Sequence, residues 1–195
     1  MKPTDTSHRR KGKKKKQEEP QILWILRIFC IAITLSALLS LLSEAVLGEA
    51  GLMLALLVLM VFILLGILFD IVGVAVTAAD PKPFHSMASH KTKGAAEALR
   101  LLNSAERVSS ICNDVVGDIC GIVSGTTAAV IVLRLREAFS LNDLLMSVVV
   151  TALISGMTIG GKAMGKNVAI RQSTKVVYFV GRVIRVFYPV RKQRR

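Results

Sequence analysis

Four long apolar tracts separated by short polar segments take up most of this chain of 195 residues. They cover residues 22–42, 52–79, 111–133 and 144–161. A helix needs about 20 mainly apolar residues to cross the roughly 30 Å hydrocarbon core of a bilayer. Inside that core the backbone must pair its own polar groups, so such tracts form helices. We therefore predict an all-α integral membrane protein with about four transmembrane helices plus amphipathic juxtamembrane helices.

The basic residues are concentrated in three segments between and beyond these tracts. Residues 1–21, 80–110 and 162–195 carry eight, five and ten of the 26 lysines and arginines, whereas residues 43–51 carry none. Loops rich in lysine and arginine stay on the cytoplasmic side. This distribution predicts a multi-pass protein of the cell (plasma) membrane, with both termini and the long middle loop cytoplasmic.

The N-terminal segment allows a second interpretation. A basic start, an apolar tract and the sequence Ser43-Glu44-Ala45 together resemble a cleavable secretory signal. The tract is longer than the 7–15 residues of a signal core, which favours a retained span and leaves cleavage as the alternative. The basic tails adjoin membrane spans, so we expect them to bind the lipid bilayer and its anionic headgroups rather than nucleic acid.

Two amphipathic segments lie on the basic side of the spans. A juxtamembrane helix is predicted at about residues 83–103, where alanine and leucine recur at helical spacing. Asn103 and Glu106 resemble a capping box that begins the next helix. Residues 172–195 read as a basic amphipathic helix and tail, because arginines inside so short an apolar run are costly at mid-bilayer.

Charged residues inside the tracts are the candidate functional site. Carboxylates cost about 2.5–3.5 kcal/mol at the centre of a spanning helix, so they are expected to face an interior and to find a partner. Asp114 and Asp118 lie one helical turn apart, and antiparallel packing of the last two spans would pair Lys162 with Asp114. Asp70 and Asp118 would then meet a hard cation or a proton, since such cations prefer oxygen ligands. The alternative is a scaffold whose lysine neutralises the aspartates permanently.

Glycines at four-residue spacing mark candidate helix-packing faces. Small residues let spanning helices approach closely, although the partner can belong to the same chain or to another. The residues are Gly117, Gly121, Gly125, Gly156 and Gly160.

No pattern indicates an enzyme. The chain has no nucleophile–base arrangement, its three histidines lack metal-ligand spacing, and its three cysteines are most simply small apolar residues. We expect no catalytic residues.

Four motifs, in order, carry a resemblance to a known family. Residues 69–76 resemble the end of a span in that family, and residues 95–102 resemble the family's A-x-x-A-L-x-L-L juxtamembrane helix. Residues 113–118 resemble the family's G-N-x-x-x-N-like motif, and residues 161–166 resemble its G-E-x-x-P-K motif. Over residues 52–190 the chain resembles, in a divergent form, the transmembrane domain of the CNNM/CorC magnesium transporters, also annotated CorB, and we expect no CBS domains.

This resemblance implies transport of magnesium or a similar divalent cation by a homodimer. It places Asp114 and Asp118 where the family has asparagines, beside Asn113. Together with Asp70, an intramembrane carboxylate of the second span, these aspartates are the expected metal ligands. It also puts Lys162 where the family has a glutamate, which favours a regulatory or scaffold role as the alternative. We expect no CBS-bound nucleotide.

The predicted domain organisation has four parts. They are a basic cytoplasmic tail (1–21), an extra transmembrane helix with a short outside loop (22–51), the CNNM-like transmembrane domain (52–171), and a basic amphipathic helix and tail (172–195).

Overall fold

A computed structural model describes residues 21–48, 51–139 and 143–187, and every regular element in these ranges is a helix. The elements in chain order are α1 (Gln21–Leu47), α2 (Leu52–Ala78), α3 (Lys82–Ser89), α4 (Ala95–Asn103), α5 (Ala105–Ser110), the π-helix η1 (Ile111–Gly117), α6 (Asp118–Phe139), α7 (Asp143–Arg171) and α8 (Ser173–Phe187). Within these ranges the expected all-α fold is confirmed.

Four of the helical stretches are long and apolar enough to cross a membrane, as judged over the described residues. They are Ile22–Leu47, Leu52–Ala78, Ala105–Leu135 and Leu144–Arg171. The third stretch joins α5, η1 and most of α6, and the fourth is about ten residues longer than its apolar tract. The four expected spans are therefore present, and three of them, the first, third and fourth, continue into more polar sequence than hydropathy alone includes.

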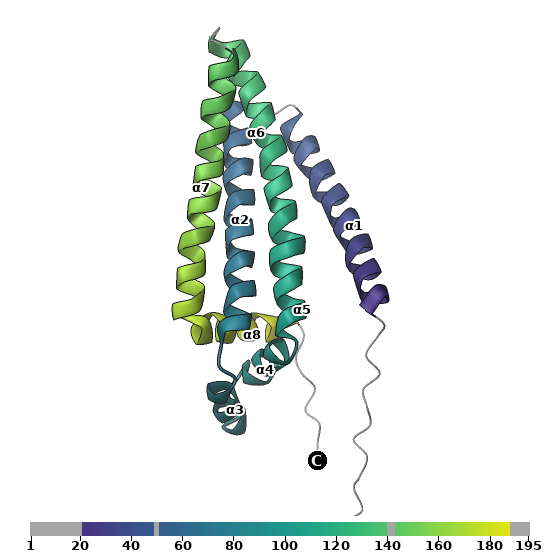
Figure 1. Cartoon of the computed structure of the whole chain (residues 1–195), viewed down its shortest axis with the longest axis vertical. Helices are drawn as coiled ribbons and strands as arrows, with labels where there is room; N and C mark the ends of the chain where they lie inside the picture. Colours follow the sequence, from purple (N-terminus) through teal and green to yellow (C-terminus); the bar gives the residue numbers. More distant parts are fainter. Residues whose placement is uncertain (1–20, 49–50, 140–142, 188–195) are drawn as a thin grey trace, which may run out of the picture.

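The four long helices lie side by side and alternate in direction (Figure 1). α2 lies between α6 and α7 and packs mainly against both, whereas α1 leans against α6 and η1. The short helices α3 and α4 gather at one end, and α8 runs across that end (Figure 1). We call this the juxtamembrane end, and the opposite end, where α1 finishes at Leu47 and α2 begins at Leu52, the far end.

α1 joins the bundle through one stripe of its surface. Ile28, Ala32, Leu35 and Leu39 are spaced three and four residues apart and pack on a buried cluster that includes Phe62, Val115 and Val123. This spacing places them on one face of the helix. The other faces of α1 are exposed, as expected of a helix that meets lipid.

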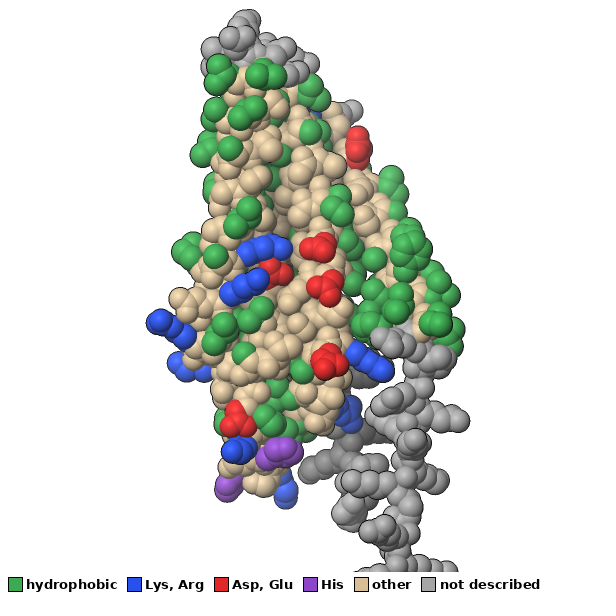
Figure 2. All heavy atoms as spheres, in the orientation of Figure 1, with side chains coloured by type: hydrophobic (Ala, Val, Ile, Leu, Met, Phe, Trp, Pro, Cys, Tyr) green, Lys and Arg blue, Asp and Glu red, His purple; other side chains and the backbone are tan. Residues whose placement is uncertain are grey.

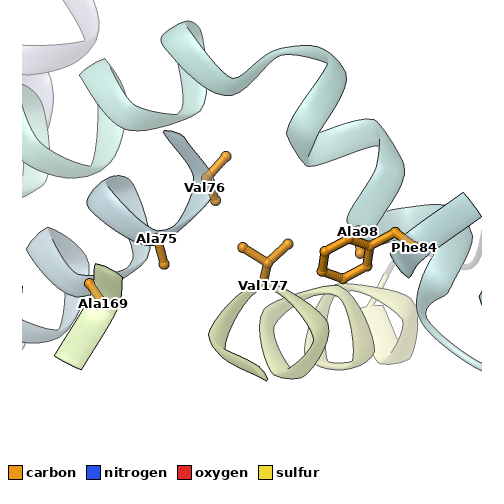
Figure 3. Close-up of a cluster of buried hydrophobic side chains, with 6 residues drawn as sticks. All are labelled: Ala75, Val76, Phe84, Ala98, Ala169 and Val177. Carbon is orange, nitrogen blue, oxygen red and sulfur yellow. The ribbon is translucent and has the colours of Figure 1, made fainter. Parts of the chain in front are cut away.

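A buried apolar cluster ties the juxtamembrane end together (Figure 3). Its members come from α2, α3, α4, α7 and α8, and they are Ala75, Val76, Phe84, Ala98, Ala169 and Val177. α8 also presses its backbone against α4, since a Cβ at Gly181 would lie 2.7 Å from the Gly94 carbonyl oxygen. The cluster fixes α8 across the bundle end and not through the membrane, as its arginines predict.

The predicted juxtamembrane helix and its capping box need correction. Two helices, α3 and α4, replace the single helix, because the chain between them turns through left-handed conformations at Lys91 (φ 56°) and Gly94 (φ 94°). Asn103 is the last residue of α4 and caps nothing. Ser104 precedes α5, and its hydroxyl donates to the Arg100 carbonyl oxygen at 3.0 Å, closing the end of α4 instead.

Candidate functional site

The faces of α2 and of η1 and α6 meet along a seam of small residues. A Cβ at Gly66 would lie 3.3 Å from the Cys120 Cβ, and one at Gly73 would collide with the Asn113 amide. Between them, a Cβ at Gly117 would lie 2.8 Å from Asp70 Oδ1. Glycine is therefore required where the two helices approach most closely, and the Asp70 carboxylate lies inside the seam.

Asp70 is a buried carboxylate that forms an ion pair with the fourth span. Its residue is 5% exposed, and Lys162 Nζ lies 3.0 Å from Asp70 Oδ2. The position is about 12 Å from the end of α2, at 1.5 Å per residue. A carboxylate at this depth needs a counter-charge, and α7 supplies it.

The packing of α7 on α2 sets this pair. Gly161 and Gly165 leave room on α7 for the side chains of Ile67 and Ile71, which protrude from α2. Lys162, next to Gly161, is thereby brought level with Asp70. These two isoleucines and two glycines determine the register of the two helices.

The expected pairing of Lys162 with Asp114 is wrong. Lys162 pairs with Asp70 because α2, rather than η1, packs along α7 at this level. Asp114 Oδ2 instead accepts a hydrogen bond of 2.8 Å from the Ser110 hydroxyl. Asp114 and Asp118 are exposed on the outer face of η1 and α6. Acidic and basic side chains gather about halfway along the face drawn in Figure 2.

The three aspartates do not form one cluster. In the described part of the chain, no group of three or more histidine, cysteine, aspartate or glutamate side chains is placed to hold a metal ion. Asp70 lies inside the bundle, whereas the other two carboxylates face outward. The site therefore has an inner position at Asp70 and an outer position at Asp114 and Asp118.

An unsatisfied oxygen lies in the same seam, against Gly73, which is three residues further along α2 than Asp70. Asn113 Nδ2 donates to the Ser109 hydroxyl at 3.2 Å, while Asn113 Oδ1 is buried without a hydrogen-bond partner. Asn113 belongs to the π-helix η1, a rare conformation that occurs frequently at functional sites. A buried acceptor of this kind is costly unless something binds it, and a cation would do so.

Two of the seam glycines, Gly66 and Gly73 on α2, were not predicted from the sequence, and neither was the π-helix. Gly66 and Gly73 lie four residues before and three after Asp70, a spacing that puts all three on one helix face. That spacing could have identified the seam. The π-helix has no comparable signal in the sequence.

The glycines chosen as packing residues divide into two groups. Gly117 faces Asp70 closely, as described above. A Cβ at Gly121, Gly125, Gly156 or Gly160 would meet nothing within 4 Å inside this chain. These four therefore leave open strips on α6 and α7.

A bundle of four helices that are long and apolar enough to cross a membrane, with a buried ion pair between two of them, defines a polytopic membrane protein. Residues 57–192 match the family model described as the Cyclin M transmembrane N-terminal domain, CNNM. The chain belongs to this family. It has a membrane transport-associated role, and the family is a membrane-transporter type of domain rather than an enzyme family. α1 lies outside the matched residues.

Comparison with curated proteins and with solved structures found no significant match.

Proposed function

We propose that this protein transports a divalent cation of the magnesium type through an inner site centred on Asp70. The observation that carries the proposal is the buried Asp70 carboxylate in the same seam as the unsatisfied Asn113 Oδ1, which lies against Gly73, three residues further along α2. Carboxylate and amide oxygens are the ligands that magnesium prefers, usually with several retained waters. The bound cation would supply the positive charge that Asp70 needs at this depth.

In this proposal Lys162 neutralises Asp70 when no cation is bound. Lys162 Nζ lies 3.0 Å from Asp70 Oδ2, so an entering cation must displace the ammonium group. Asp114 and Asp118 lie one turn apart on an exposed face and would act as an outer position that attracts the ion.

A second function is favoured by the same ion pair. If Lys162 never leaves Asp70, the inner site stays neutral and the protein is a non-transporting scaffold or a regulatory subunit. Asp70 would then serve only to fasten α2 to α7.

Uptake of magnesium into proteoliposomes, read with an enclosed magnesium-sensitive dye, distinguishes the two functions. For a transporter, Lys162→Gln raises uptake above the wild-type rate and Asp70→Asn abolishes it. Lys166→Gln is the matched control, because Lys166 lies one turn further along α7 and is exposed. Uptake by every variant equal to that of empty vesicles would reject transport and leave the scaffold.

We also propose a membrane location, an orientation and an oligomeric state for the protein. The basic segments support a cell-membrane location with both termini cytoplasmic and bound to anionic headgroups. The open glycine strips on α6 and α7 support a homodimer, since small residues allow close contact between helices in lipid.

A further inference from the structure

A cavity lined partly by polar side chains lies toward the far end of the bundle, between the last turns of α1 and residues 126–134 of α6. Its volume is about 260 Å³. The polar groups that line it are those of Ser40, Ser43, Glu44, Thr126 and Arg134. Pockets for drug-sized ligands usually measure about 300–1,000 Å³, so this cavity fits a smaller polar group.

Two polar contacts hold the walls of the cavity together. Arg134 Nη2 donates to the carbonyl oxygen of Leu47, the last residue of α1. The buried hydroxyls of Ser43 and Thr127 lie 3.4 Å apart. The first contact places a positive charge at the negative end of a helix, which is favourable. α1 is therefore fastened to α6 at this end, and the cavity exists only because α1 is present.

The charges in the cavity define what it can bind. Glu44 is exposed, and no ion pair involving its carboxylate is found among the described residues. A guanidinium has five N–H donors, so Arg134 can serve an anion as well as the Leu47 carbonyl. A cavity with a carboxylate on one wall and a guanidinium on the other fits a zwitterion.

The position of the cavity along α1 indicates at which level of the bilayer such a ligand is found. α1 has 27 residues, about 40 Å of helix, which exceeds the roughly 30 Å hydrocarbon core. Glu44 is three residues from its end, so the cavity opens at the level of lipid headgroups.

We propose that this cavity binds a phosphoethanolamine group. Its phosphate would contact Arg134, because arginine pairs readily with phosphate oxygens, and its ammonium would contact Glu44. The hydroxyls of Ser40 and Thr126 would complete the contacts. The bilayer offers this group as the headgroup of phosphatidylethanolamine, and solution offers it as free O-phosphoethanolamine.

Native mass spectrometry of the full chain in mild detergent tests the proposal. Equal amounts of phosphatidylethanolamine and phosphatidylglycerol are offered, the latter having a phosphate but no amine. The wild type should retain the first lipid in preference to the second. Glu44→Gln should reduce that preference by about tenfold, as loss of a charged hydrogen bond predicts. Glu106→Gln, an exposed carboxylate at the juxtamembrane end, should behave as the wild type does.

Glu44→Gln leaves both the Arg134–Leu47 and the Ser43–Thr127 contacts in place, so it is expected to fold. Added O-phosphoethanolamine separates the two sources of the ligand. Displacement of the lipid at micromolar concentrations would assign the cavity to the free molecule, and retention of the lipid would assign it to the headgroup. Equal retention of the two lipids by the wild type, or an unchanged preference in Glu44→Gln, would overturn the proposal.

Discussion

Lys162 of the fourth span and Asp70 of the second form an ion pair with Nζ 3.0 Å from Oδ2. The two side chains differ in exposure: that of Lys162 is 27% exposed, whereas that of Asp70 is only 7% exposed. The pair is therefore open to the surface of the bundle on the lysine side and closed on the aspartate side.

The first prediction concerns the stability of this pair. Lys162→Met leaves the Asp70 charge buried and uncompensated, a change that typically costs about 3–5 kcal/mol. Lys162→Met combined with Asp70→Asn removes both charges and should recover most of that loss. Thermal unfolding in detergent, arranged as a double-mutant cycle, measures the coupling. Lys166→Met is the matched control and should change stability little. Losses that simply add would refute an energetic coupling between the two side chains.

The second prediction concerns the glycine seam. Gly117→Ala would put a methyl group 2.8 Å from Asp70 Oδ1, and crowding of this kind costs about 1–3 kcal/mol. Gly121→Ala, four residues later, would meet nothing within 4 Å. It should be neutral or slightly stabilising, since alanine favours helix. The melting temperatures of the two variants separate the effect of close packing from that of helix propensity. Equal shifts in melting temperature would contradict a close approach of the helices at Gly117.

The third prediction tests the proposed homodimer. Gly121→Leu would fill the open strip on α6 and should hold two copies apart. Förster transfer between differently labelled copies in vesicles measures their association, with Ile122→Leu as a control at the adjacent exposed position. Transfer as strong in Gly121→Leu as in wild type would place the dimer interface elsewhere.

The fourth prediction tests the proposed orientation. In a background without native cysteines, His90→Cys at the juxtamembrane end should resist a membrane-impermeant thiol reagent in intact cells. Gly51→Cys at the far end should react, because Gly51 is exposed and has open space around it. Labelling of position 90 from outside would reverse the orientation.

The membrane spans could be predicted from the sequence, but the ion-pair partners of the charged residues could not. Hydropathy depends on composition, so the four tracts and the amphipathic α8 could be found without any knowledge of packing. The pairing of Lys162 depends on which helix lies beside α7, and chain order suggested the third span, where Asp114 lies in η1. The interlocking of Ile67 and Ile71 with Gly161 and Gly165 places α2 there instead. Such a choice among neighbours is a property of the assembled bundle.

Side chains interlock on both sides of α2. Toward α7, Ile67 and Ile71 insert into the spaces left by Gly161 and Gly165, and interlocked side chains oppose shear. Toward η1, the Asn113 amide fills the space at Gly73, and the Asp70 carboxylate fills the space at Gly117. The second span is therefore expected to resist sliding along either neighbour, so that Asp70 keeps its height in the bundle relative to both Lys162 and Asn113.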